Sequence, residues 1–112
     1  MSAPLLGWAA DLKLGFITSL SGPSSSLGIP YAKGLQAGVT YRPDIDGKKV
    51  QVVQLDDASD PTTAARNARK LVVEDNVDAL IGTAGTPSGI AIAGVARELK
   101  VPFFFAATSS AS

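Results

Sequence analysis

A loop of small residues in the second half of the chain has the composition of an anion-binding site. It spans residues 82–89, with the sequence GTAGTPSG, and lies between an apolar run and a helical pattern. Glycine lets a ligand approach the backbone closely, Thr86 is a favourable N-cap residue, and Pro87 suits the first helical position. The free N–H groups at the start of the helix are suited to bind a carboxylate or a phosphate. An ordinary strand-to-helix turn capped by Thr86 is the alternative, and the loop alone does not decide between the two.

Three carboxylates follow the second apolar run. Asp56, Asp57 and Asp60 could hold Mg²⁺ or form an aspartyl-phosphate pocket, because paired carboxylates at a strand end suit a hard cation. A phosphate-receiving domain would instead carry its acidic pair after the first strand, where this chain has serines. We therefore interpret Asp60 as the N-cap of a helix that begins at Pro61, and the other two as turn residues. No metal site is predicted.

The glycines of the 82–89 loop also raise the possibility of a nucleotide site. Gly82, Gly85 and Gly89 differ in spacing from the dinucleotide-binding fingerprint, and they follow the third apolar run rather than the first. Gly47 and Lys48 precede a strand, which is the wrong context for a phosphate-binding P-loop. No acidic residue is placed to bind a ribose. A nucleotide-binding α/β enzyme domain is the alternative function, and these departures disfavour it.

Missing residue types exclude several kinds of chemistry. The 112 residues include no histidine and no cysteine, which removes the imidazole base, the Ser-His-Asp triad, the thiolate nucleophile and the disulfide. Ten basic and ten acidic side chains cancel, which leaves no electrostatic footprint for a nucleic acid or an anionic membrane. We therefore predict no enzyme activity, no catalytic residue, no metal, no cofactor and no nucleic-acid partner.

Apolar runs alternate with helical patterns, and this alternation predicts the fold class. We expect strands over residues 12–18, 50–56, 78–81 and 102–106, and helices over residues 30–41, 61–75 and 87–99. Gly34 and Gly38 weaken the first helix and predict close packing of that helix on the sheet. The repeated order of strand, helix and strand predicts an α/β fold with a doubly wound parallel sheet and helices on both faces.

The same topology predicts where a ligand would bind. Sheets of this kind bind ligands beyond the carboxyl ends of their strands. The segments that reach this edge are residues 19–28, 57–60, 83–88 and 107–112, and three of them are rich in Ser, Thr, Gly and Ala. Such a composition favours a neutral pocket that binds its ligand through hydrogen bonds. The 19–28 segment is longer than a usual strand-to-helix connection, which also favours a binding role.

Short motifs along the chain are similar, in order and spacing, to those of type I periplasmic-binding proteins. The motifs are Leu14-Gly15-Phe16, Leu20-Ser21-Gly22-Pro23, Leu27-Gly28, Lys33-Gly34, Asp56-Asp57-Ala58-Ser59-Asp60-Pro61, Ala79-Leu80-Ile81-Gly82, Val101-Pro102 and Ala107-Thr108-Ser109-Ser110. The chain resembles most the branched-chain amino-acid (leucine, isoleucine, valine) substrate-binding proteins of ABC importers. The resemblance implies a flavodoxin-like strand order, with residues 12–112 as the N-terminal part of the first of two lobes. Residues 1–11 are then interpreted as a remnant of a secretion signal or an appended tail.

The resemblance also implies the residues that contact a ligand. They are Thr86, Ser88, Ala107, Thr108, Ser109 and Leu27. The first two match the family's carboxylate site after the third strand, where a hydroxyl and backbone N–H groups meet the ligand. Ala107 and Ser109, with Thr108 between them, match the site after the fourth strand, where carbonyl and hydroxyl groups meet the α-ammonium. Leu27 stands where the family often has an aromatic residue over the ligand side chain.

By the same resemblance, the chain acts in the periplasm with a small amino acid or related carboxylate as ligand and an ABC-transporter membrane permease as partner. The family's second lobe, which closes over the ligand, has no counterpart in these residues, so weak binding is expected. The last strand would leave an apolar edge at residues 103–105 uncovered, which predicts self-association into a homo-oligomer. A self-associating fragment without ligand binding is a further alternative.

Overall fold

The computed structural model describes residues 12–42, 44–45 and 48–105, in which strands and helices alternate. In chain order the elements are β1 (Leu12–Thr18), α1 (Ser25–Tyr41), β2 (Asp44–Ile45), β3 (Lys48–Asp56), α2 (Pro61–Val73), β4 (Ala79–Gly82), α3 (Thr86–Leu99) and β5 (Phe103–Phe105). The strands form one sheet in the order β2-β3-β1-β4-β5. None of the described helices has both the length and the hydrophobicity needed to cross a bilayer.

Four of the strands, β1, β3, β4 and β5, run parallel. β1 pairs with β3, with Leu12 opposite Val50, and on its other side with β4, with Leu14 opposite Ala79. β5 pairs with β4 in parallel, whereas the two-residue β2 pairs with β3 antiparallel. Without β2, the order across the sheet confirms the predicted doubly wound, flavodoxin-like arrangement. The sequence does not predict β2 because two residues are too few to show a periodic pattern.

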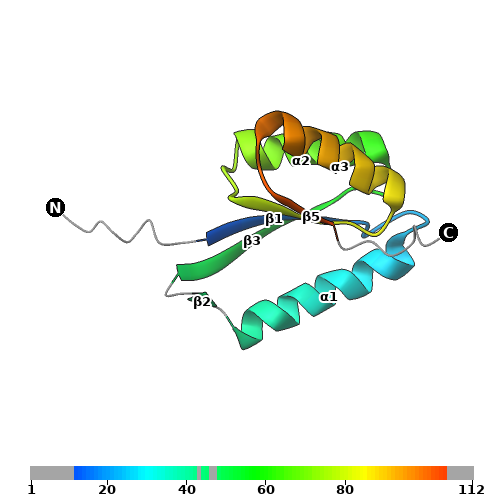
Figure 1. Cartoon of the computed structure of the whole chain (residues 1–112). Helices are drawn as coiled ribbons and strands as arrows, with labels where there is room; N and C mark the ends of the chain where they lie inside the picture. The colour runs from blue at the N-terminus through cyan, green and yellow to red at the C-terminus, as the bar shows by residue number, and fades with distance from the viewer. Residues whose placement is uncertain (1–11, 43, 46–47, 106–112) are drawn as a thin grey trace.

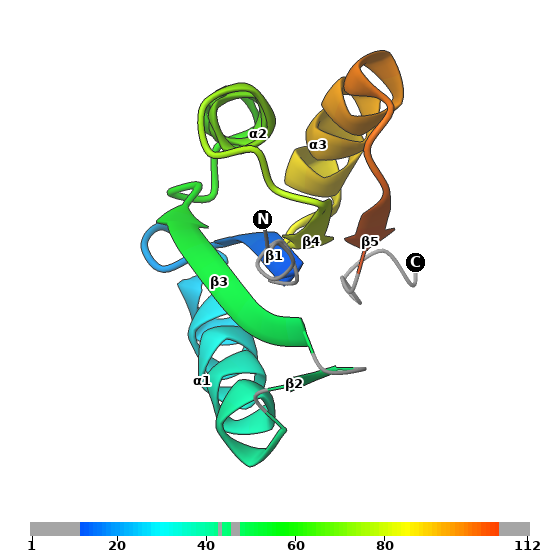
Figure 2. The same ribbon diagram turned by 90° about the vertical axis from the view of Figure 1, so that its left-hand side faces the viewer.

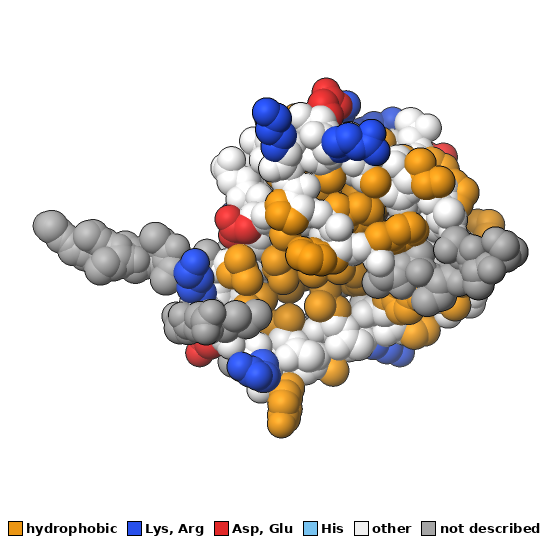
Figure 3. All heavy atoms as spheres, viewed as in Figure 1, with side chains coloured by type: hydrophobic (Ala, Val, Ile, Leu, Met, Phe, Trp, Pro, Cys, Tyr) orange, Lys and Arg blue, Asp and Glu red, His pale blue; other side chains and the backbone are white. Residues whose placement is uncertain are grey.

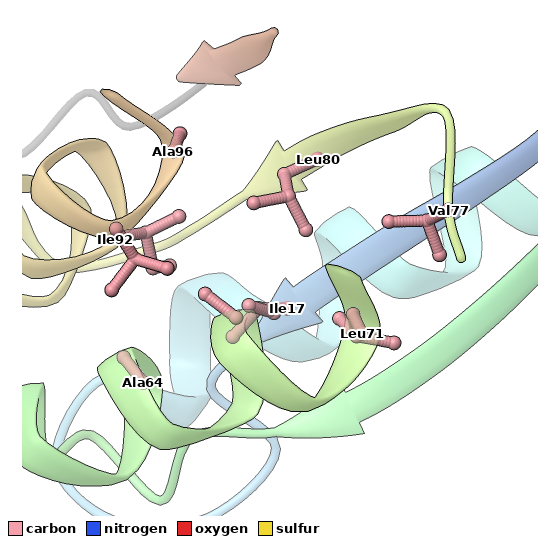
Figure 4. Close-up of a cluster of buried hydrophobic side chains, with 9 residues drawn as sticks. Ile17, Ala64, Leu71, Val77, Leu80, Ile92 and Ala96 are labelled. Carbon is pink, nitrogen blue, oxygen red and sulfur yellow. The ribbon is translucent and has the colours of Figure 1, made fainter. Parts of the chain in front are cut away.

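The helices cover the two faces of the sheet differently (Figures 1 and 2). α1 lies on one face, and α2 and α3 lie side by side on the other. A cluster of buried hydrophobic side chains fills the space between the sheet and the α2–α3 pair (Figure 4). Ile17, Leu71 and Leu80 are fully buried in this cluster. The main hydrophobic cluster therefore lies on one side of the sheet, and Phe16 is buried on the side that faces α1.

α1 does not show the close packing that its glycines predict. A Cβ atom placed on Gly34 or Gly38 would meet no atom within 4 Å. Hollows separate this helix from the sheet instead. One of about 320 Å³ is lined by Phe16 and Ile81 among others, and another of about 560 Å³ reaches the polar side chain of Gln54. The prediction of close packing at Gly34 and Gly38 is wrong. A glycine in a helix permits close packing but does not require it, and these two have open space beside them.

α1 also begins earlier than predicted, at Ser25 rather than at Pro30. The carbonyl of Ser24 accepts hydrogen bonds from the N–H groups of Leu27 and Gly28, each at 3.0 Å. The chain is therefore already helical before it reaches the proline. Pro30 lies inside the helix, where its missing N–H removes one hydrogen bond without ending the helix.

The start of α2 confirms the prediction made from its capping residues. Asp60 has an extended backbone, and its carboxylate accepts hydrogen bonds from the backbone N–H of Thr63 at 2.9 Å and from the Thr63 hydroxyl at 2.7 Å. These hydrogen bonds hold the pKa of the Asp60 carboxyl below its ordinary value. Pro61 is the first residue of the helix. Asp60 is thus an N-cap residue.

α3 begins one residue earlier than the loop sequence predicts. Its N-cap is Gly85, which has an extended backbone with φ −104° and ψ 141°, and Thr86 is the first helical residue. The predicted N-cap role of Thr86 is therefore wrong. Pro87 does not determine at which residue α3 starts. The N–H groups of a helix's first turn have no hydrogen-bond partner within the helix, so a proline, which lacks an N–H, fits the second position as well as the first.

Candidate functional site

Three loops meet at the carboxyl edge of the sheet. They are residues 19–24 between β1 and α1, residues 57–60 between β3 and α2, and residues 83–85 between β4 and α3. The sequence predicts a ligand site at this edge, so the geometry of these loops decides whether such a site can form. Two adjacent carboxylates, Asp56 and Asp57, hold the loops together.

Asp57 is fully buried and connects the ends of three strands. Its Oδ1 accepts hydrogen bonds from the Ser19 hydroxyl at 2.7 Å and from the backbone N–H of Ser59 at 2.8 Å. Its Oδ2 accepts a hydrogen bond from the Thr83 hydroxyl at 2.8 Å. The backbone N–H of Asp57 donates to the carbonyl of Thr18 at 3.0 Å. The three side-chain contacts replace the water that a buried carboxylate loses, so the network is stable away from solvent.

Asp56, the last residue of β3, is partly buried and binds the neighbouring loop. Its Oδ1 accepts from the backbone N–H groups of Leu20 at 2.9 Å and Ala58 at 2.7 Å, and its Oδ2 accepts from the Ser21 hydroxyl at 2.7 Å. Burial raises the pKa of Asp56, but these hydrogen bonds outweigh burial and hold that pKa below its ordinary value. Within the described residues, no group of three or more acidic side chains is placed to hold a metal ion. The carboxylates organise loops, in keeping with their interpretation as turn residues.

Ser59 joins two of the loops, and the third lies next to them. The Ser59 hydroxyl donates to the carbonyl of Ser21 at 2.8 Å and accepts from the backbone N–H of Ser24 at 2.9 Å. A Cβ atom placed on Gly85 would lie 3.5 Å from the Ser24 hydroxyl oxygen. The N-cap of α3 therefore lies beside the loop that leads into α1.

Three of the residues that the resemblance assigns to a ligand site are described in the structure, and they lie at this edge. Thr86 and Ser88 belong to the first turn of α3, where Thr86 is half-buried and Ser88 is 3% exposed. Leu27 belongs to the first turn of α1 and is 40% exposed. The N–H groups of a helix's first turn, together with its dipole, can bind an anion such as a carboxylate. The other predicted site residues, Ala107, Thr108 and Ser109, lie outside the described residues.

The network around Asp57 is not among the predicted features. The place of Asp57 after a strand predicts a turn residue, and no role is predicted for Ser19 or for Thr83. A signal was present, since a hydroxyl follows β1, a hydroxyl follows β4 and a carboxylate follows β3. These three strands are neighbours in the sheet, and the carboxyl ends of parallel strands meet at one edge. The strand order together with the residue types could have predicted the contact.

β5 forms an exposed apolar edge, as its sequence predicts. Phe104 is 61% exposed and Phe105 is 42% exposed. Figure 3 shows hydrophobic side chains gathered over β5 and toward the space between the sheet and α1. The ring of Phe105 also lies against Gly89 in α3, where a Cβ atom would collide with it. This surface is distinct in composition from the polar loops at the carboxyl edge.

Comparisons with known proteins agree with this arrangement. Residues 11–112 match the family model described as periplasmic binding protein. The chain is 32% identical over 99 residues to the Leu/Ile/Val-binding protein homolog 7 of Brucella suis, an alignment that covers 86% of this chain and 25% of that protein. The structure is similar to that of the branched-chain amino acid transporter substrate binding protein LivJ from Streptococcus pneumoniae in complex with isoleucine. The TM-score is 0.80 at 30% identity, and the match covers 88% of this chain and 29% of that chain.

A second solved structure has a different ligand. It is the solute binding protein of an ABC transporter from Rhodopseudomonas palustris BisB5 in complex with 3,4-dihydroxybenzoic acid, with a TM-score of 0.82 at 31% identity over 88% of this chain and 28% of that one. The chain spans about a quarter of the length of the relatives it matches. These relatives are solute-binding proteins rather than enzymes, which overturns the nucleotide-binding enzyme alternative. With the family model matched from residue 11 to residue 112, the chain belongs to the periplasmic binding protein family.

Proposed function

We propose that the chain is part of the periplasmic solute-binding component of an ABC importer and holds the carboxylate of a branched-chain or related amino acid at the start of α3. The names of the relatives support the ligand class. The observation that carries the proposal is the position of Thr86, whose half-buried side chain lies in the first turn of α3 at the carboxyl edge of a parallel sheet. Ligands of such sheets bind at this edge.

The first turn of α3 suits a carboxylate without any cationic side chain. The Thr86 hydroxyl and the first-turn N–H groups would donate hydrogen bonds to the carboxylate, and hydrogen bonds to an ionised acceptor are strong. Ser88 lies two residues further on in the same turn and would support the same contact. Ala107 and Ser109, with Thr108 between them, would accept hydrogen bonds from the α-ammonium. Leu27 would contact the ligand side chain, and the membrane permease would receive the ligand.

A titration of the ¹⁵N-labelled chain with L-leucine tests the carboxylate site. The described residues form one side of a site, which leaves much of the ligand in water, so we expect a dissociation constant on the order of 1 mM. The amide signals of Gly85, Thr86 and Ser88 should shift. Thr86→Ala should abolish the response, and the matched control Thr86→Ser, which keeps the hydroxyl, should retain it. An unchanged leucine response in Thr86→Ala would refute the assignment.

An aromatic carboxylate is the second candidate ligand. The structural neighbour in complex with 3,4-dihydroxybenzoic acid supports it. Such an acid would use the same contacts at the start of α3 but has no ammonium group. Parallel titrations with leucine and 3,4-dihydroxybenzoate therefore discriminate between the two, since the true ligand class saturates at the lower concentration and depends on Thr86.

A further inference from the structure

Asp57 is a buried carboxylate that the proposed carboxylate contact does not use. It is fully buried, and the ion pairs in the described part of the chain are Arg69 with Glu98 and Lys70 with Asp75. Asp57 is therefore stabilised by neutral donors. Burying a carboxylate in this way is costly unless every oxygen is hydrogen-bonded, and here both oxygens are. A fully satisfied network of this kind holds its hydrogen-bond donors in one position relative to one another.

The donors come from separate segments of the chain. The Ser59 N–H belongs to the same turn as Asp57, so that hydrogen bond is local. The hydroxyls of Ser19 and Thr83 belong to the loops after β1 and β4, the two strands that lie beyond β3 in the sheet. One carboxylate thus holds the ends of three neighbouring strands.

Each of the two distant links leads to a different side of the proposed ligand site. Thr83 begins the short loop that ends at the N-cap of α3, directly before Thr86. On the other side, the backbone of Ser19 lies so close to Gly28 that a Cβ atom on Gly28 would collide with the Ser19 carbonyl. The Thr18 hydroxyl also donates to the Gly28 carbonyl at 2.9 Å. Ser19 is therefore fixed against the first turn of α1.

The geometry points to Asp57 as a positioning residue for the ligand site: its carboxylate fixes the first turn of α3 relative to the first turn of α1, and so sets the affinity for the ligand. This inference rests on the function proposed above. Asp57 does not touch the ligand itself, since it is fully buried. It acts through Thr83 on the segment that carries Thr86, and through Ser19 on the segment that carries Leu27.

The chemistry of the network predicts which substitution should preserve it. The N–H of Ser59 can only donate, so the position of Oδ1 must remain an acceptor. The hydroxyl of Thr83 can donate or accept, so the position of Oδ2 can be occupied by an amide NH₂ group. Asp57→Asn meets both conditions with its carbonyl oxygen at the first position and its nitrogen at the second. Asp57→Ala meets neither.

The test compares three variants of the full chain by two readouts. The first readout, the amide chemical shifts of Thr86 and Leu27, is taken without ligand, and the second is the dissociation constant for L-leucine. Asp57→Ala should move both amides and weaken leucine binding about tenfold or more, whereas Asp57→Asn should keep the amides in place and bind within about threefold of the wild type. Val77→Ala is the matched control, because Val77 is buried at the opposite end of the sheet and its truncation lowers the melting temperature without touching the network.

The single links provide a second test should Asp57→Ala fail to fold. Thr83→Val removes the contact to the loop before α3 and should move the amide of Thr86 more than that of Leu27. Ser19→Ala should do the reverse. Three outcomes would overturn the inference. The first is that Asp57→Ala shifts the amides no more than Val77→Ala does. The second is that Asp57→Asn shifts the amides and weakens leucine binding as much as Asp57→Ala does. The third is that Thr83→Val and Ser19→Ala give the same pattern of amide shifts. If the wild type does not respond to leucine, the proposed function fails, and the amide shifts alone then decide whether Asp57 positions the two turns.

Discussion

The two faces of the sheet differ in how they are packed, although both are covered by helices. On the α2–α3 face, Ile17, Leu71 and Leu80 are fully buried and belong to one continuous cluster. On the α1 face, the helix buries Gly28 and Ala32, and hollows of about 320 and 560 Å³ lie between it and the strands. Because buried apolar area is the main stabilising term in folding, the α2–α3 face should supply most of the stability.

This difference does not extend to the two helix turns of the proposed ligand site. The first turn of α3 rests on the well-packed face, and the first turn of α1 is held against Ser19 at Gly28, although the rest of α1 lies over the hollows. Both turns of the proposed site are therefore anchored, and the looser packing lies further along α1. The two faces should differ in energy as they differ in structure.

The largest effect is expected from a truncation in the cluster. Leu71→Ala should lower the free energy of unfolding by about 3 kcal/mol, because it removes a fully buried side chain and leaves a cavity. Leu35→Ala in α1 is the matched control, because Leu35 is half-buried and lines the hollows. It should cost less than about 1 kcal/mol. Urea unfolding measures both, and equal losses would show that the two faces contribute alike.

A pair of glycines in α1 compares a tightly packed position of that helix with an open one. Gly28→Ala should destabilise the chain by about 1–3 kcal/mol, because the new Cβ atom would collide with the backbone of Ser19. Gly34→Ala meets no atom and should stabilise α1 by about 0.5–1 kcal/mol through helix propensity. Thermal unfolding of the two variants should therefore shift in opposite directions. A shift in the same direction would contradict the described packing of α1.

The same contrast explains what the sequence could predict. The parallel sheet and the α2 cap at Asp60 follow from local patterns, namely alternating apolar runs and an Asp-Pro start signal. Gly34 could not be interpreted correctly, because a glycine in a helix looks the same in sequence whether it faces a neighbour or a hollow. Asp57 and Thr83 are 26 residues apart, so their contact depends on strand order and not on local sequence. Hydrophobic periodicity and residue propensity are local signals, so they do not predict tertiary contacts of this kind.

The exposed edge at β5 gives the third prediction. We expect the chain to self-associate at micromolar concentration through Phe104 and its neighbours, because β5 is an apolar edge strand of the described sheet and such a strand favours edge-to-edge pairing. Phe104→Lys should abolish the association, since a charge on an edge strand opposes pairing. Val73→Lys is the matched control, because Val73 is 64% exposed at the end of α2. A sedimentation-velocity experiment in which the wild type is a monodisperse monomer would contradict this prediction.

The smallest effect is expected from acid, and it should begin at the carboxyl edge rather than in the core. Hydrogen bonds hold the pKa of Asp56 in the folded chain below its ordinary value of 3.8. The contribution of Asp56 to stability is therefore complete above that value and is lost as the pH falls through the folded pKa. It is small, because Asp56 is only partly buried and solvent screens its contacts.

Amide signals followed during acid titration check the sequence of these events. Leu20 and Ala58 donate their N–H groups to Asp56, so their signals should change before that of Leu80, which lies in the buried cluster. In Asp56→Asn the early change should disappear, because no carboxyl is left there to protonate. If Leu80 changed together with Leu20 in the wild type, the loops and the core would form a single cooperative unit. The carboxyl edge would then have no stability of its own, separate from that of the core.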